Sequence, residues 1–142
     1  MKSIISKSMM LLAICTALLS FTSKPGGEGF EIYVNNKVVI QKFGSEINTV
    51  QSLQLNQYSS GDQLTIKYHH CGKVGKDRVV TIKDGQNKVL KEFRYADATT
   101  PVAAMVVNIK DLQTLKKINS SSLKLLYTSS ELPQGRVLAI IP

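Results

Sequence analysis

Short apolar runs separated by turn residues make up most of the chain from residue 30 onward. In many runs apolar and polar residues alternate, as they do in strands with one buried face. The clearest case is residues 64–70, where Leu64, Ile66, Tyr68 and His70 fall on one face. The runs are 30–34, 37–43, 50–55, 64–70, 78–83, 88–95, 102–109, 123–127 and 137–141. This pattern predicts an all-β domain.

The residues between the runs predict hairpin turns. Asn35-Asn36 separates the first two runs, and asparagine tolerates the positive φ that a tight two-residue turn requires. Asp84-Gly85 is a second hairpin signal, with positive φ expected at Gly85. A further turn is expected at 132–135, before the last run. Such turns favour antiparallel neighbours.

Two segments depart from simple alternation. Residues 102–109 are almost wholly apolar, which predicts a strand covered on both faces. Residues 111–119 have apolar positions at three-residue spacing after Asp111, a candidate N-cap, and this predicts one short helix. Together the elements favour an antiparallel two-layer sandwich, immunoglobulin-like in architecture, with a small β-barrel as the alternative.

The N-terminal residues have the order of charge and hydropathy found in a signal peptide. Lys2 and Lys7 supply positive charge, residues 9–19 are uncharged and mostly apolar, and small residues follow. This order predicts a signal peptide over 1–22, cleaved after Thr22. The mature protein would then be exported to the periplasm or the extracellular space, with no transmembrane span after cleavage.

Two other readings of this leader are weaker. A membrane anchor would need roughly 20 apolar residues, and the apolar stretch 9–21 is shorter. Lipidation of Cys15 would require a small residue before the cysteine, and Ile14 stands there. Residues 23–29 are rich in glycine and predict a flexible tether. Residues 30–142 are then a single domain, which is long enough to bury a core.

Charge indicates what a partner of this domain would look like. The formal net charge is +8, and it falls to about +6 when Lys2 and Lys7 leave with the leader. Basic residues are densest between 73 and 94, where they form either a solvated hairpin surface or a docking face for an anionic glycan, a lipid headgroup or an acidic protein. Nucleic acid is excluded, because an exported chain rarely meets it and no aromatic-basic recognition motif is present. These residues are Lys73, Lys76, Arg78, Lys83, Lys88, Lys91 and Arg94.

His69, His70 and Cys71 bring three side chains that can bind metals into consecutive positions. Alternate residues of a strand share a face, so His69 and Cys71 could bind one ion together. Further ligands would have to come from carboxylates, backbone or solvent. The other readings are a strand that ends in polar residues with an inert thiol, and a reactive or dimer-forming Cys71.

No sequence motif identifies an enzyme. The nucleophile-elbow pattern GxSxG is absent, and the acidic residues are well separated along the chain. The sequence therefore favours an exported, non-enzymatic binding or structural module of unknown ligand, with no cofactor. Two alternatives stay open: a metal-binding protein that uses His69 and Cys71, and a hydrolase whose carboxylate pair is assembled by the fold.

Overall fold

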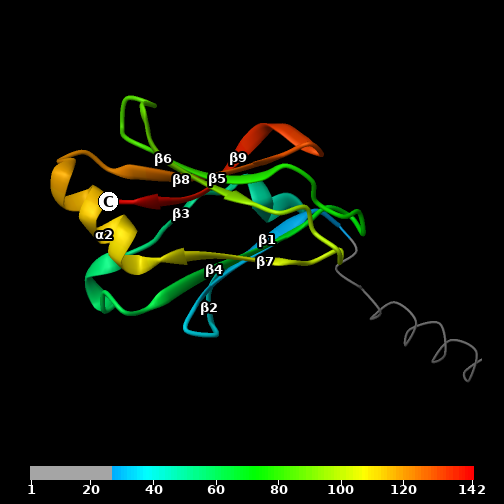
Figure 1. Ribbon diagram of the computed structural model, residues 1–142, viewed down its shortest axis with the longest axis horizontal. Coiled ribbons are helices and arrows are strands. Elements are labelled where there is room, and N and C mark those ends of the chain that lie inside the picture. The colour runs from blue at the N-terminus through cyan, green and yellow to red at the C-terminus, as the bar shows by residue number, and fades with distance from the viewer. Residues whose placement is uncertain (1–26) are drawn as a thin grey trace, which may run out of the picture.

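The computed structural model describes residues 27–142, which form two β-sheets packed face to face with a short helix at one end (Figure 1). The strands are β1 (Gly29–Val34), β2 (Lys37–Phe43), β3 (Gln51–Ser52), β4 (Gln63–His69), β5 (Arg78–Lys83), β6 (Val89–Tyr95), β7 (Ala104–Asn108), β8 (Leu123–Ser129) and β9 (Leu132–Ile141). The helices are η1 (Gly44–Asn48), η2 (Leu55–Gln57) and α2 (Ile109–Ile118), of which the first two are 3-10 helices. The sheets have the strand orders β2-β1-β4-β7 and β3-β9-β8-β5-β6.

The predicted all-β sandwich is confirmed, and the barrel alternative is wrong because the strands form two separate sheets. All strand pairs are antiparallel within residues 27–142 except β3 with β9, which run parallel. The sandwich has the two layers of an immunoglobulin domain. Its strand order differs from the A-B-E-D and C-F-G orders of a constant domain, because β1 lies inside its sheet and not at an edge.

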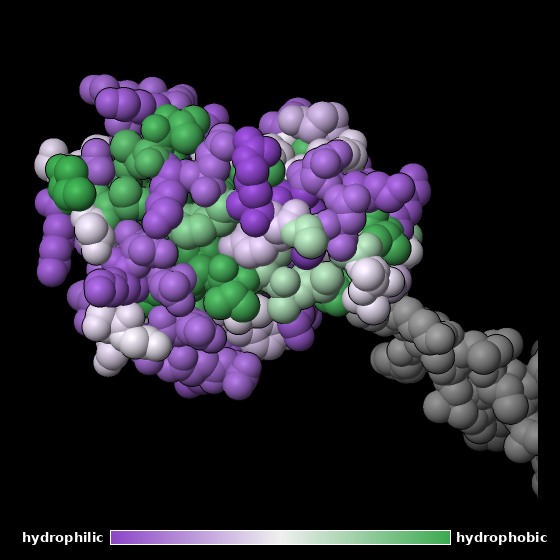
Figure 2. Space-filling model, in the orientation of Figure 1, coloured by the Kyte–Doolittle hydropathy of each residue, from purple (hydrophilic) through white to green (hydrophobic). Residues whose placement is uncertain are grey.

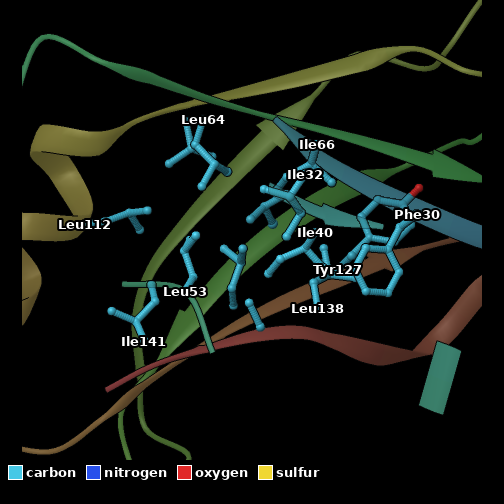
Figure 3. Packing of buried hydrophobic residues seen from close by; sticks show 14 of the residues in the cluster. Phe30, Ile32, Ile40, Leu53, Leu64, Ile66, Leu112, Tyr127, Leu138 and Ile141 are labelled. Atoms are coloured by element: carbon cyan, nitrogen blue, oxygen red, sulfur yellow. The ribbon is translucent and has the colours of Figure 1, made fainter. Parts of the chain in front are cut away.

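The core lies between the two sheets, and Figure 3 shows its side chains meeting there. The alternation predicted for β4 is confirmed, because Leu64, Ile66 and Tyr68 all point inward and are buried, as is His70 just beyond the strand. Each fully buried aliphatic side chain of this kind contributes about 1.5–3 kcal/mol. His70 therefore faces the core because it continues the two-residue alternation of its apolar neighbours.

The predicted helix is present but begins earlier than expected. It covers Ile109–Ile118 instead of 111–119, and its N-cap is Asn108. Asp111 lies in the first turn and pairs with Lys91, whose Nζ is 3.4 Å from Asp111 Oδ1. Ile109 and Leu112, on the same face of the helix, are both fully buried. The helix closes one end of the core because these side chains continue the apolar interior of β7.

The prediction that residues 102–109 are covered on both faces is wrong. The strand formed there, β7, lies at the edge of its sheet, and its residues alternate between buried and exposed. Met105 and Val107 face the core, whereas 44% of Val106 is exposed. An almost wholly apolar run does not by itself distinguish a central strand from an edge strand with apolar residues on its solvent face.

The hairpin between β5 and β6 forms where it was predicted, but with a different turn. The residue with positive φ is Asn87, at 64°, and not Gly85. The Asp84 carboxylate accepts hydrogen bonds from the backbone N–H groups of Gln86 and Lys88, both at 2.9 Å. The loop consists of residues 85–87, and its last residue, Asn87, is in the left-handed region. Three-residue hairpin loops commonly combine a type I turn with such a residue.

The two remaining turn predictions differ in outcome. The Asn35-Asn36 turn is confirmed, with φ of 49° and 68° at these residues. The turn expected at 132–135 is wrong, because β9 already begins at Leu132 and Ser129 pairs with Leu132. Proline is tolerated at the start of a strand, so Pro133 does not force a turn here.

The N-terminal boundary of the domain is earlier than residue 30. The predicted signal peptide at 1–22 and most of the tether at 23–29 lie outside the described residues. Gly29 belongs to β1 and pairs with Phe43 and His69. A Cβ atom at Gly29 would lie 2.0 Å from a ring carbon of Phe43, so the packing there requires glycine. None of the helices in residues 27–142 has the length and apolar character that a membrane span requires.

Candidate functional site

The two residues of the predicted metal pair lie in different surroundings. His69 lies on the outer face of the four-stranded sheet, with its Nε2 3.7 Å from Glu31 Oε2 and its ring against the edge of Phe43. Cys71 is exposed in a two-residue turn, with φ of 54°. Within residues 27–142 no group of three or more His, Cys, Asp or Glu side chains is arranged to hold a metal ion. Metal binding by His69 and Cys71 stays a prediction.

We expect protein purified without added metal ions to contain no stoichiometric zinc or copper. His69 faces a carboxylate on its own sheet, and a stable zinc site in a protein takes about four ligands. Metal content should be measured by mass spectrometry of the acid-digested protein, for the unmodified chain and for His69→Ala and Cys71→Ser. About one ion per chain, lost in both variants, would instead make metal binding the leading function.

A network of polar side chains lies at the end of the sandwich opposite α2. Arg136 donates from Nε to the Tyr68 hydroxyl at 2.9 Å and from Nη1 to Asn48 Oδ1 at 2.9 Å, and its Nη2 lies 3.3 Å from Glu28 Oε1. The Tyr68 hydroxyl donates to the same Glu28 oxygen. Burial, and then this hydrogen bond, raise the pKa of Tyr68, so its hydroxyl keeps its proton. The network joins residues far apart in the chain, and sequence reasoning missed it.

His70 and Tyr127 form the inner part of this polar end. His70 Nε2 lies 2.8 Å from the Tyr127 hydroxyl and 3.5 Å from Ser129 Oγ. The Tyr127 ring stacks on Tyr68 with centroids 4.5 Å apart. Burial lowers the pKa of His70, and the Arg78 cation lowers it further, although two nearby carboxylates act in the opposite direction. Near neutral pH His70 is therefore a neutral imidazole that is hydrogen-bonded to the Tyr127 hydroxyl.

A pocket of about 320 Å³ opens beside this network and brings two carboxylates together. One belongs to Glu28, which is paired with Arg136. The other belongs to Glu131, and its pKa is lowered in spite of the opposing effect of burial, because it accepts hydrogen bonds such as that from the Lys76 N–H. A glycosidase needs one carboxyl group that is protonated near neutral pH. The lowered pKa of Glu131 does not suit that role, and the hydrolase hypothesis stays a prediction. The pocket is lined by Glu28, His70, Cys71, Lys73, Glu131, Leu132, Gln134 and Arg136.

The basic residues between 73 and 94 do not form one surface. Arg78 is buried, and its guanidinium donates to two backbone carbonyls of the β6–β7 loop, so it cannot belong to a docking face. Arg94 Nη2 is 2.9 Å from Glu92 Oε2, and Lys91 is paired with Asp111. Lys73 and Lys76 lie at the polar end, whereas Lys83 and Lys88 flank the β5–β6 turn at the end that carries α2.

A groove of about 420 Å³ crosses the outer face of the five-stranded sheet. Val80 and Ile82 point into the core, so Val79, Thr81 and Lys83 point outward by strand alternation. Leu126 and Thr128 of β8 continue the floor, and Pro133 and Gln134 at the start of β9 also line the groove. The groove is lined by Val79, Thr81, Lys83, Val89, Glu92, Arg94, Leu126, Thr128, Pro133 and Gln134.

Comparison of the sequence with protein-family models gives no match, and neither does comparison with curated proteins. A functional assignment for this chain therefore depends on the groove, the pocket and the polar network themselves.

Proposed function

We propose that this chain is an exported, non-enzymatic binding module whose ligand lies in the groove on the outer face of the five-stranded sheet. The order of charge and hydropathy in residues 1–22 supports export. The observation that carries the assignment is the groove itself, which has about 420 Å³ of open volume, an apolar and hydroxyl floor, and cations from two strands. Binding sites commonly combine concave apolar surface with a few placed polar groups.

The charges in the groove favour an anionic ligand. Lys83 of β5 lines the groove and lies directly opposite Lys124 of β8, which points to the same outer face beside the groove. Among residues 27–142 no carboxylate lies within 4.0 Å of either ammonium group. Like charges in directly opposite positions destabilise a sheet. A carboxylate bound beside this pair would relieve the repulsion, so the lysines select for acidic ligands.

The floor of the groove favours an acidic protein segment over a glycan. Val79 and Leu126 offer apolar contacts for alternate side chains of an extended peptide, and Thr128 offers a hydroxyl. Sugars in protein sites commonly stack on aromatic rings, and none of the lining residues is aromatic. The proposed ligand is therefore an extended stretch of a partner protein in which apolar and acidic residues alternate.

Site-specific crosslinking in the native host tests this proposal. A photoreactive phenylalanine analogue placed at Leu126, on the groove floor, should give a protein adduct after irradiation. The matched control is the same analogue at Thr65, which points outward from the other sheet. The adduct at position 126 should fall about fivefold when Lys83→Gln and Arg94→Gln are combined, because each exposed ion pair is worth up to about 1 kcal/mol.

Three results would contradict the proposal. Equal adducts at positions 126 and 65 would mean that the groove is not selective, and no adduct at position 126 would mean that it is empty in the host. An adduct that is degraded by glycosidases but not by proteases would assign the groove to a glycan.

A further inference from the structure

The end of the sandwich that carries α2 has a surface of its own, which we call the distal tip. It consists of the β5–β6 turn, the C-terminus of α2 and the loop that leads into β8. The tip carries two exposed apolar residues among five lysines. The residues that define it are Lys83, Lys88, Val89, Lys116, Lys117, Ile118 and Lys124.

Hydrogen bonds hold the three parts of the distal tip together. The Gly85 N–H donates to Ser121 Oγ at 3.3 Å, which joins the turn to the loop. Lys124 Nζ donates to Asn87 Oδ1 at 2.7 Å, and Lys116 Nζ donates to the Ser121 carbonyl at 2.9 Å. The lysines therefore lie on one continuous surface although they come from distant parts of the chain.

The positive charge of the distal tip is not neutralised by the protein. Within residues 27–142 no carboxylate lies within 4.0 Å of any of its five ammonium groups. The acidic residue of the turn is Asp84, and its Oδ1 accepts two backbone N–H groups of the turn itself. Lysine clusters of this kind attract anionic surfaces over about a Debye length.

The exposed apolar residues add a second and independent feature. Ile118, the last residue of α2, is 75% exposed, and Val89 is 48% exposed. Figure 2 shows hydrophobic residues exposed among hydrophilic ones toward this end of the molecule. A single exposed apolar residue is common on protein surfaces, so the exposure of Ile118 supports a docking role only together with the lysines around it.

We propose that the distal tip docks on the surface of an anionic lipid bilayer. Ile118 enters the boundary between headgroups and acyl chains, and the lysines contact the lipid phosphates. Lysines that surround a projecting apolar side chain are the combination by which peripheral proteins bind anionic membranes. An acidic protein would instead bind the lysines through its carboxylates, and the binding test below distinguishes it from a bilayer.

This docking is separate from the function proposed for the groove. The groove opens on the flank of the five-stranded sheet, whereas Lys88, Lys116, Lys117 and Ile118 do not line it. The two surfaces share Lys83 and Val89, and Lys124 lies opposite Lys83, so these three residues are left unchanged in the test below. Membrane docking can fail while the groove still binds its ligand, and the reverse is also possible.

The absence of tryptophan from the sequence makes the test direct. Ile118→Trp in the full chain gives a unique fluorophore at the distal tip. Its emission should shift to shorter wavelength with vesicles of equal parts phosphatidylglycerol and phosphatidylcholine, and not with phosphatidylcholine alone. The control is Val50→Trp. Val50 is 49% exposed and lines a different pocket, together with Arg136 of the polar end. Any membrane contact made by residues 1–26 is common to both variants.

Charge variants complete the experiment. Lys116→Gln and Lys117→Gln should each weaken vesicle binding about fivefold, since a lysine near an anionic surface is worth about 1 kcal/mol. Lys73→Gln and Lys76→Gln remove the same charge at the opposite end and should change binding less than about twofold. No shift at position 118, an equal shift at position 50, or equal effects of the two lysine pairs would overturn the proposal. Binding to polyglutamate but not to vesicles would overturn it in favour of an acidic protein.

Discussion

Arg78→Ala is expected to lower the free energy of unfolding by about 3 kcal/mol. The guanidinium is buried and donates from Nε and Nη2 to the Ala96 carbonyl, at 3.1 and 2.8 Å, and from Nη1 to the Ala103 carbonyl, at 3.0 Å. Without it both carbonyls lose a charged donor, and the side chain leaves a space beside Tyr95. The loop between β6 and β7 would lose its attachment to β5. Urea unfolding followed by circular dichroism measures the change.

Arg94→Ala is the matched control, because it removes the same charge from an exposed site. The Arg94 guanidinium is 74% exposed and pairs only with Glu92, so its loss should cost less than about 1 kcal/mol. Arg78→Lys should not restore stability, since a single ammonium group cannot reproduce the planar fork that reaches two carbonyls. Equal losses for Arg78→Ala and Arg94→Ala would show that Arg78 is not a structural residue.

The sequence could predict most strands because the apolar alternation is local, and it could predict the first turn because asparagine tolerates positive φ. Residues 37–43 and 78–83 form strands with the predicted bounds, and Asn35-Asn36 closes the predicted turn. Strand pairing between distant segments has no such local signature. The parallel contact of β3 with β9 and the edge position of β7 depend on which strands meet in space, and periodicity does not carry that information.

The functional surfaces were less predictable for the same reason. Counting charges between residues 73 and 94 treats Arg78 as a surface cation, although the fold turns it inward to backbone carbonyls. The groove requires β5, β6, β8 and β9 to be neighbours, and the distal tip combines a turn with a helix end more than twenty residues away. One signal was present: alternation put His70 on the core face, which indicates a buried histidine and not a solvent-facing metal ligand.

The Arg136 network and the distal tip differ in how their charges are paired. Arg136, the cation of the network, contacts Glu28, whereas Lys73 and Lys76 at the same end have no carboxylate within 4.0 Å among residues 27–142. At the distal tip the lysines have no carboxylate partners among residues 27–142. Matched charges fix local structure, whereas unmatched charges remain available for a partner. The Arg136 network therefore supports local stability, and the distal tip is the surface that we propose for contact with other molecules.

Stability should also fall as the pH drops below about 6.5, because of His70. Burial holds the pKa of the folded-state imidazole below the unfolded value of 6.5, so the unfolded chain takes up a proton first as the pH falls. The unfolded state then binds more protons than the native state, and the free energy of unfolding declines. The stabilisation is complete above pH 6.5 and is lost as the pH falls toward the folded-state pKa. For a single proton the slope reaches at most about 1.4 kcal/mol per pH unit.

The adjacent histidine provides the control for this prediction. His70→Gln should remove the slope between pH 8 and pH 5, while His69→Gln, which leaves His70 in contact with the Tyr127 hydroxyl, should retain it. Urea unfolding at half-unit steps of pH gives the free energy of unfolding against pH for the unmodified chain and the two variants. The carboxylates are common to all three proteins, so their contribution cancels when the curves are subtracted. Stability falls toward low pH because His70 is neutral in the folded state. Its protonation there would bury a charge, and would do so near the Arg78 cation. A slope that persists in His70→Gln would show that other groups cause it. Stability that increases toward low pH in the unmodified chain, but not in His70→Gln, would show that the imidazole is charged in the native state.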